Sequence, residues 1–399
     1  MTGFLDSKLN EKISRLSESI ITERELEGRL KSGKKLRIKY GVDVTSPFLH
    51  LGHAVNLWLM RAFQEGGHKV VFLIGDFTTK IGDPTGRNEK RPRVSDNDIK
   101  KSAKEFIKQV SKILLTDKNV FEIRKNSEWY SKMGAGGLVE LMSLFTNAQL
   151  IERDMFQKRI REGKEVYEHE LIYPLLQGYD SVILKSDMTI IGSDQLFNEM
   201  RGRDLQEKFG QKPQIIITTK ITPGIRGGEK QSKSLGNYIA LNDSAREKFG
   251  KIMSVPDDLT VQYFEIYSDV ALARIEKIKQ GVSGGTLNPR DAKMELAEAI
   301  ALKYHGKKEA EEARNFFVKT FQKRSAPEDA EELAVKNGST LKDALVAGKL
   351  ARSNAEAHRL IIDGAVEFDG IAIRNPNEKI KSGGTLRVGK KRFAKIKIK

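Results

Sequence analysis

The sequence has no cysteine among its 399 residues, which excludes disulfides, a thiolate nucleophile and cysteine-bound zinc. No apolar run approaches the roughly 18 residues of a membrane span. Residues 1–20 are charged and helical in pattern, unlike a signal peptide. The chain also lacks the GxxxxGK[ST] pattern, which disfavours a P-loop ATPase. We therefore expect a soluble, cytoplasmic protein that makes no membrane contact.

Positive charge is in excess and unevenly placed. Lys and Arg total 70 against 54 Asp and Glu, a net charge of +16. Residues 339–399 hold 14 Lys and Arg but only 6 Asp and Glu, so half of the excess lies in this tail. Such an asymmetry favours a nucleic-acid partner, with a solvated basic surface as the alternative.

Hydrophobic periodicity predicts a parallel sheet near the N-terminus. Residues 35–44 alternate like a strand, 51–64 have helical periodicity, and 69–74 form an apolar run, which together make a βαβ unit. Short apolar runs at 188–191 and 214–218 extend the sheet. Ligands of such sheets bind at the carboxyl ends of strands, so the residues that follow each run are the candidates for function.

The chain is long enough for two or three domains. We predict an α/β fold in which residues 1–243 form a Rossmann-like catalytic domain with a mainly helical insertion at about 87–163. An all-helical domain at 244–323 and a linker at 324–338 follow. Residues 339–399 form a small α+β domain.

The sharpest local motif is HLGH at residues 50–53, directly after the first strand and at the start of a helix. His50 and His53 are three residues apart, so both can face a ligand whose phosphates lie over the helix N-terminus. Gly52 allows a nucleotide to approach the backbone closely. Two ordinary surface histidines, or half of a metal site, are the alternatives.

A second motif, GGEKQSKS at residues 227–234, follows the last predicted strand. Its glycines give flexibility, and Lys230 and Lys233 are compact mobile charges suited to following a leaving phosphate. A solvated basic loop is the alternative. The position after a strand favours the ligand-binding edge of the sheet.

HLGH and KQSKS together resemble the signature pair of class I aminoacyl-tRNA synthetases. Further segments stand in the order and approximate spacing of tyrosyl-tRNA synthetases, so the resemblance covers essentially the whole chain: 43–50 (DVTSPFLH), 81–87 (IGDPTGR), 173–180 (YPLLQGYD) and 192–195 (GSDQ). It implies that ATP activates L-tyrosine as tyrosyl-adenylate and that the tyrosyl group passes to tRNA-Tyr. It also implies Mg²⁺ accompanying ATP without a protein-ligated metal, and a homodimer with an apolar surface near residues 138–150.

The resemblance also assigns residues to roles. The two signature motifs stabilise the pentavalent phosphate through four residues: His50, His53, Lys230 and Lys233. Positions that contact ATP are Asp43, Thr45, Pro47, Gly52, Gly192, Asp194, Ser232 and Ser234. Positions that contact tyrosine are Asp83, Tyr173, Gln177, Asp180 and Gln195.

The spacing of Tyr173, Gln177 and Asp180 agrees with a ligand site, because steps of four and three residues place them on one helical face. Buried polar groups need partners, which an amino acid would provide, with an internally satisfied polar patch as the alternative. An acceptor at Asp180 aimed at a phenolic hydroxyl would reject phenylalanine by roughly 10⁴ to 10⁵.

Three positions depart from the family pattern. Lys39 stands where familiar bacterial members have a tyrosine that also contacts the substrate hydroxyl, and the nearby tyrosine is Tyr40. Lys39 either donates to that hydroxyl or points to solvent. Ile191 replaces a glycine and narrows or shifts the ribose pocket. Gln231 replaces the methionine of KMSKS and leaves both lysines in place.

The basic tail resembles an S4-type RNA-binding domain, on the strength of SNAEAHRLI at 353–361, Gly364 and VGK at 388–390. Basic side chains there can meet phosphates with salt-sensitive affinity, namely Arg352, Arg359, Lys390, Lys391 and Arg392. A generic basic tail is the alternative. The remaining histidines, for which the sequence indicates no partner, are treated as structural: His68, His169 and His305.

Two functions of other classes stay open. One is a non-catalytic RNA-binding relative that keeps the fold and the tail. The other is an adenylating paralogue that uses another aromatic substrate, which Lys39 and Ile191 keep in play.

Overall fold

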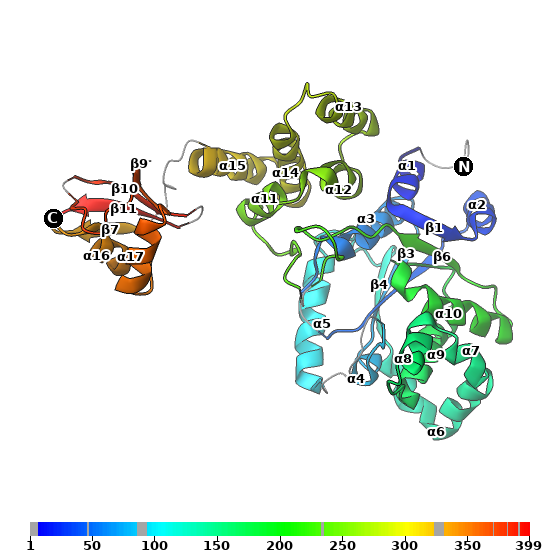
Figure 1. Cartoon of the computed structure of the whole chain (residues 1–399). Coiled ribbons are helices and arrows are strands. Elements are labelled where there is room, and N and C mark those ends of the chain that lie inside the picture. Colours follow the sequence, from blue (N-terminus) through cyan, green and yellow to red (C-terminus); the bar gives the residue numbers. More distant parts are fainter. Residues whose placement is uncertain are drawn as a thin grey trace. The chain divides into compact units, whose positions relative to one another are not determined.

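The computed structural model of the chain forms two compact units, the first comprising residues 1–243 and 254–292 and the second residues 244–253 and 293–399 (Figure 1). It describes residues 7–45, 48–85, 94–232, 235–322, 331–369, 371–380, 382–389 and 392–399. Within these ranges no helix is both long enough and apolar enough to cross a membrane.

A six-stranded sheet organises the first unit, in the order β1-β6-β5-β2-β3-β4. The strands are β1 (Ser17–Ile21), β2 (Arg37–Val42), β3 (Lys69–Ile74), β4 (Phe121–Lys125), β5 (Met188–Gly192) and β6 (Ile215–Thr219). All neighbours are parallel except β1, which pairs antiparallel with β6. The predicted Rossmann-like parallel sheet is therefore confirmed. Because the chain proceeds from β2 towards β4 and later from β5 towards β6, the order reverses between β2 and β5, where such sheets bind ligands.

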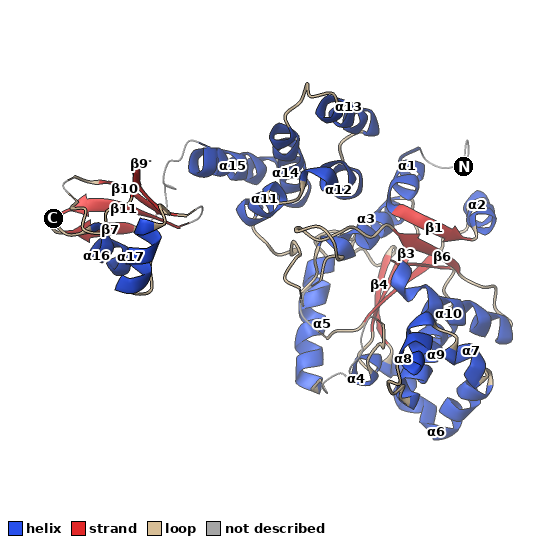
Figure 2. Cartoon of the chain, in the orientation of Figure 1, coloured by secondary structure: helices blue, strands red, loops and turns tan. Residues whose placement is uncertain are grey.

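Helices flank this sheet (Figure 2). Tyr40 of β2 reaches Asn56 of α3, whereas the preceding residue, Lys39, reaches Gln177 of α9. Successive side chains of a strand point to opposite faces, so α3 and α9 cover different faces. The helices of this unit are α1 (Ser7–Leu16), α2 (Glu23–Lys31), α3 (Leu51–Glu65), α4 (Thr78–Ile81), α5 (Asp96–Val110), α6 (Ser127–Ser143), α7 (Asn147–Ile151), α8 (Asp154–Arg161), α9 (Glu168–Leu184), α10 (Leu196–Lys208), α12 (Thr260–Tyr267) and α13 (Leu272–Ser283).

The central strands are buried on both faces. All five residues of β6 are buried, as are five of the six in β3. Near-continuous apolar runs are typical of parallel strands that helices cover on both sides. This burial is why these two strands are evident in the sequence.

Two edge strands fall where the sequence predicts helix. β1 occupies the end of the helical pattern over residues 1–20, and β4 lies inside the predicted helical insertion, 87–163. Both are mostly polar and partly exposed, and Ile123 in β4 is 40% exposed. Neither has an apolar run because each lies at an edge of the sheet, so pairing with β6 or β3 decides its conformation.

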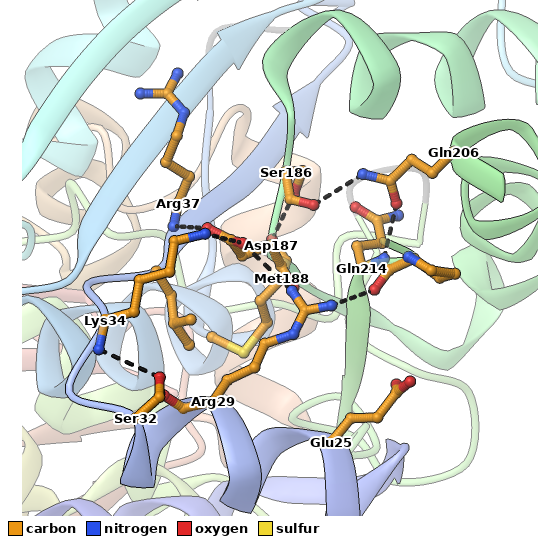
Figure 3. Close-up of polar contacts among 12 residues, drawn as sticks. Glu25, Arg29, Ser32, Lys34, Arg37, Ser186, Asp187, Met188, Gln206 and Gln214 are labelled. Carbon is orange, nitrogen blue, oxygen red and sulfur yellow. Dashed lines mark hydrogen bonds and ion pairs between the residues drawn. The ribbon is translucent and has the colours of Figure 1, made fainter. Parts of the chain in front are cut away.

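Asp187 ties the N-terminal segment to the start of β5 (Figure 3). Its carboxylate accepts from Lys34 Nζ at 3.3 Å and from the backbone N of Arg37 at 3.0 Å. Arg29 Nη1 donates to the Asp187 carbonyl at 2.8 Å. The segment that leads into β2 is thereby fixed at the end of the sheet where the parallel strands begin.

The second unit contains helices and a small sheet. Its helices are α11 (Ala245–Met253), most of α14 (Pro289–His305), α15 (Lys307–Phe317), α16 (Leu341–Ala347) and α17 (Asn354–Ile362). The sheet has the order β7-β11-β10-β8-β9, with β7 (Glu332–Val335), β8 (Val366–Phe368), β9 (Ile371–Ile373), β10 (Gly384–Val388) and β11 (Arg392–Ile398). The strand β7 comes from the predicted linker and pairs parallel with β11. Leu345, Ile361 and Leu386 are fully buried in the core between this sheet and its two helices.

Candidate active site

A cavity of about 500 Å³ opens at the carboxyl ends of β2 and β5. It brings together residues from all three sets that the sequence nominates: His50, His53, Lys230, Asp43, Thr45, Gly52, Gly192, Asp194, Ser232, Asp83, Tyr173, Gln177, Asp180 and Gln195. Three further nominated positions, Pro47, Lys233 and Ser234, lie outside the described residues. A ligand of substrate size fits a cavity of this volume.

The HLGH motif forms the first turn of α3. His50 is the N-cap, and its backbone N donates to His53 Nδ1 at 3.3 Å. The two imidazole rings lie 3.9 Å apart between centroids. A helix N-terminus with adjacent imidazoles is suited to a phosphate.

The C-terminal end of the lysine loop, which comprises residues 220–240, contacts the first turn of α3. His50 forms an antiparallel bridge with Ala240, Leu51 N donates to the Ile239 carbonyl at 3.0 Å, and Leu241 N donates to the Leu49 carbonyl at 2.9 Å. Backbone hydrogen bonds thus join the HLGH motif to the segment that follows the second motif.

Two side chains organise the lysine loop. Gln231 is buried, with Nε2 2.8 Å from Tyr267 Oη and Oε1 accepting from Ile239 N at 3.3 Å. Asn237 accepts from Ser232 N at 2.8 Å and donates to the carbonyl of Lys230 at 3.2 Å. Gln231, at the family's methionine position, therefore acts as an anchor of the loop.

Lys230 extends from the loop into the cavity. Its Nζ lies 3.2 Å from Asp194 Oδ2, with 52% of the side chain exposed. An exposed ion pair of this kind contributes only about 0 to 1 kcal/mol to stability. The lysine can therefore exchange Asp194 for a phosphate.

Polar side chains with mutual hydrogen bonds line the opposite part of the cavity. Tyr173 Oη donates to Asp43 Oδ2 at 3.0 Å, and Gln195 Nε2 donates to Asp83 Oδ2 at 2.8 Å. Gln177 Oε1 accepts from Asn198 Nδ2 at 2.9 Å. The sequence nominates all of these residues except Asn198. The nominated residues each have a protein partner and also border the cavity.

Asp180 lies among aromatic and amide groups at this end. Trp129 Nε1 donates to its Oδ1 at 3.0 Å, and Asn126 Nδ2 contacts its Oδ2 at 3.4 Å. Burial raises the pKa of Asp180 to about 7, while the Lys39 charge and the hydrogen bonds act in the opposite direction. The carboxyl is therefore an acceptor whose charge changes near neutral pH.

Lys39 does not point to solvent. Its side chain is 1% exposed, and Nζ lies 2.9 Å from Glu199 Oε2. Tyr40 lies on the other face of β2, 6.0 Å from Phe72 between ring centroids, and burial raises its pKa to about 12. The sequence did not identify Glu199 as the partner of Lys39, because the two residues lie on different elements.

Ile191 and Gly192 form the end of β5. Ile191 is 7% exposed and borders the cavity, so the side chain that replaces the family's glycine occupies space there. A Cβ atom at Gly192 would lie 2.6 Å from Asp194 Oδ1. Glycine at 192 therefore permits the close approach of Asp194.

Arg153 is a neighbour of the site that the sequence did not reveal. Its guanidinium donates to Thr85 Oγ1 at 2.6 Å, and its charge lies over the Phe197 ring at 5.5 Å. Burial lowers its pKa, against the opposing charges of Asp83 and Asp194. Arg153 stands at the start of α8, a charged helix. Nothing in the sequence distinguishes it from the surface arginines and lysines around it.

The basic residues of the tail differ in their surroundings. Arg352 and Arg359 are exposed. Arg392 donates to the Leu350 carbonyl and lies 3.9 Å from Glu356 Oε1. Lys390 and Lys391 lie outside the described residues.

Two of the remaining histidines have local partners. Nδ1 of His68 accepts from Leu36 N at 3.0 Å, and burial lowers its pKa to about 4. His305 Nδ1 lies 3.3 Å from Glu309. Among the residues the structure describes, no group of three or more His, Asp or Glu side chains is arranged to hold a metal ion.

Comparison with known families identifies the class. The family described as "tRNA synthetases class I (W and Y)" matches residues 31–322. The chain therefore belongs to this family of class I tRNA synthetases.

Full-length relatives narrow the assignment. The tyrosine--tRNA ligase of Thermotoga maritima is 44% identical over 379 residues, which is 94% of each chain. That of Shewanella oneidensis is 44% identical over 398 residues, 99% of each chain. These relatives place the chain in the tyrosine--tRNA ligase branch of the family.

Solved structures share the fold. A C-terminally truncated mitochondrial tyrosyl-tRNA synthetase from Aspergillus nidulans has a TM-score of 0.65 at 22% identity, covering 80% of this chain and 95% of that one. The Archaeoglobus fulgidus tyrosyl-tRNA synthetase complexed with L-tyrosine has a TM-score of 0.60 at 21% identity, covering 77% and 99%.

Proposed function

We propose that this chain activates L-tyrosine with ATP to form tyrosyl-adenylate and then transfers the tyrosyl group to tRNA-Tyr. The cavity carries this proposal. It joins the histidines of α3, the lysine loop and the polar face of α9 in one space. The full-length similarity to tyrosine--tRNA ligases supports it.

In the first step, a carboxylate oxygen of tyrosine forms a bond to the α-phosphorus of ATP. The bond from that phosphorus to its bridging oxygen breaks, and pyrophosphate leaves. His50, His53, Lys230 and Lys233 stabilise the charge that grows on the phosphates. No protein nucleophile is needed.

Two sets of residues recognise the substrates. Asp83, Tyr173 and Gln177 hold the ammonium group of tyrosine, Asp180 accepts from its hydroxyl, and Gln195 lies near its carboxylate. The adenosine and phosphates of ATP contact the second set, namely Asp43, Thr45, Pro47, Gly52, Gly192, Asp194, Ser232 and Ser234. Mg²⁺ enters with ATP as part of the substrate.

In the second step, a hydroxyl of tRNA-Tyr attacks the carbonyl of the adenylate and loses its proton, and AMP leaves. The basic tail, as an S4-like domain, contacts the tRNA backbone. The protein acts in the cytoplasm.

We propose a homodimer through the segment 138–150, in which Val139 is 65% and Met142 is 36% exposed. Exposed apolar side chains on one helix are a common feature of subunit interfaces. Sedimentation of the Val139→Glu protein should then give a monomer, and an unchanged dimer would reject this surface.

Amino-acid-dependent pyrophosphate exchange tests the activity, followed by charging of tRNA-Tyr. Exchange that depends on L-tyrosine supports the proposal. No exchange with any amino acid would identify a non-catalytic RNA-binding relative. Exchange with a different aromatic amino acid, without tRNA charging, would identify an adenylating paralogue.

A further inference from the structure

Lys39 and Glu199 form a buried ion pair beside the cavity. Their side chains are 1% and 2% exposed, and Nζ lies 2.9 Å from Oε2. Removing two charges from water is costly, and an apolar pair of similar volume is often as stable. A contribution to folding therefore does not explain why the pair is present.

The pair is fully hydrogen-bonded to groups of the tyrosine side of the cavity. Lys39 Nζ donates to Ser181 Oγ at 2.7 Å and to the Gln177 carbonyl at 3.1 Å. With Glu199, this accounts for all three donors of the ammonium group. Glu199 accepts from Gln177 Nε2 at 2.8 Å and from Gln214 Nε2 at 2.7 Å. Gln177 is thus held at both its backbone and its side chain.

Further hydrogen bonds hold this arrangement from behind. The backbone N of Gln214 donates to Gln206 Oε1 at 2.7 Å, and Gln206 Nε2 donates to the Ser186 carbonyl at 2.8 Å (Figure 3). This connected network leaves the ammonium group few alternative positions.

Asp180 lies between the two α9 residues that Lys39 contacts, Gln177 and Ser181. Lys39, Gln177, Asp180 and Glu199 all border the same cavity. The Lys39 ammonium is therefore a fixed positive charge in the wall of the cavity that Asp180 also borders. Trp129 and Asn126 donate to Asp180, and Tyr130 of α6 is a further titratable group that acts on it.

We propose that the Lys39–Glu199 pair is a specificity determinant, in which Lys39 acts on Asp180 and positions Gln177, so that tyrosine is accepted and phenylalanine rejected. This inference rests on the proposed tyrosine activation and assigns a positioning role to two residues. Glu199 fixes Lys39, and Lys39 acts through Asp180 and Gln177. A phenolic hydroxyl then donates to an ionised acceptor, whereas a phenyl ring offers that buried carboxylate no hydrogen bond, which is costly.

Steady-state pyrophosphate exchange with tyrosine and with phenylalanine, measured from pH 6 to 9, tests this role. For Lys39→Met we expect the ratio of kcat/KM for tyrosine over phenylalanine to fall by about tenfold or more. Most of the change should be a higher KM for tyrosine. The midpoint of the rise of that ratio with pH should move upward by about one unit, because Asp180 loses the nearby positive charge.

The double variant Lys39→Met with Glu199→Gln separates specificity from folding. Its charges are removed together, so its Tm should exceed that of Lys39→Met, in which Glu199 is buried without its cation. The ratio of kcat/KM for tyrosine over phenylalanine should nevertheless stay low in the double variant. The midpoint of the rise of that ratio with pH should stay high. A wild-type ratio and midpoint in either variant would overturn the proposal.

Arg159→Met is the matched control, because it breaks another largely buried pair. Arg159 lies 2.7 Å from Glu170, and their side chains are 6% and 13% exposed. We expect a lower Tm with an unchanged tyrosine-to-phenylalanine ratio. An equal loss of specificity in this control would overturn the assignment to Lys39. If the wild-type protein shows no tyrosine-dependent exchange, the proposed function itself is rejected. If the wild-type protein is active and the Lys39 variants keep its specificity, only the role of the ion pair is rejected.

Discussion

The backbone of His50 is bridged to that of Ala240, although the two residues are distant in the sequence. This bridge fixes the end of the lysine loop against the first turn of α3. The adjacent bond from Leu51 N to the Ile239 carbonyl, 3.0 Å long, reinforces it. Closure of the loop over phosphates is therefore expected to involve the stretch before Ala240, where both lysines lie.

Replacing Lys230 with alanine should lower kcat for pyrophosphate exchange by about 10²-fold, the usual effect of removing one donor to a transition-state charge. The KM for tyrosine should change little, because Lys230 contacts Asp194, a residue proposed to bind ATP. Arg226→Ala, an exposed cation of the same loop, is the control and should stay within about twofold. Equal losses in both variants would indicate a general charge effect, and an unchanged rate for Lys230→Ala or Lys233→Ala would reject the loop assignment.

Discrimination between tyrosine and phenylalanine should rise with pH between about 6 and 8, because the pKa of Asp180 is raised to about 7. Above that pH the carboxylate is ionised, and phenylalanine offers it no hydrogen bond in place of the one from the tyrosine hydroxyl. Since the folded pKa exceeds the ordinary value of 3.8, the contribution of Asp180 to stability is complete below pH 3.8 and is lost as the pH rises through 7. The ratio of kcat/KM values measured across this range should be low and flat for Asp180→Asn, and a wild-type slope in that variant would contradict the role.

Gly178→Ala should disturb the spacing of α9 and α10. A Cβ atom there would lie 2.9 Å from the backbone of Arg201 and Gly202, so one helix must move. These helices carry Gln177 and Glu199, and we expect the KM for tyrosine to rise about fivefold, together with a lower Tm. Gly28→Ala in α2 meets no atom within 4 Å and should leave both quantities unchanged or raise Tm slightly.

His68 should make the fold sensitive to acid. Burial lowers its pKa to about 4, the positive charge of Lys35 acts in the same direction, and the neutral ring accepts a hydrogen bond from Leu36 N. Stability from this group is complete above about pH 6.5 and is lost as the pH falls through 4, by up to about 3 kcal/mol. Urea unfolding at pH 7.5 and 4.5 should show a smaller pH dependence for His68→Asn, whose amide oxygen can also accept. An identical pH dependence would exclude His68 as its source.

Binding of tRNA-Tyr should depend on salt through the exposed arginines of the tail. If Arg352 and Arg359 each neutralise one phosphate, either alanine substitution should reduce the slope of log K against log salt by about 0.7 to 0.9. Filter binding at several salt concentrations measures this slope. Lys307→Ala, with a side chain 84% exposed on α15, is the control and should keep the wild-type slope.

The buried part of the fold was predictable and its edges were not. β3 and β6 are apolar runs because both faces are covered, so they are evident from composition. β1 and β4 are mostly polar, and their conformation depends on distant partners that no local pattern records. Edge strands are decided by pairing, which a sequence window does not contain.

The same distinction applies to the site. His50 and Gln177 belong to local patterns whose spacing reflects a helix. Lys39, Arg153 and Asn198 act through contacts across elements, such as the 2.9 Å pair between Lys39 and Glu199. The sequence marked Lys39 as unusual but did not reveal its buried partner.

Lys39 and Tyr40 are consecutive residues of β2, one facing α9 and the other facing α3. Sliding this strand by a single residue would exchange the faces on which the two side chains lie, turning the ammonium towards α3 and the phenol towards α9. Deleting one residue between Ser32 and Leu36 would thus alter the cavity from both faces of β2 without substituting any residue that lines it. The length of the connection that leads into β2 therefore contributes to tyrosine selection, because it sets which side chains of the strand face the cavity.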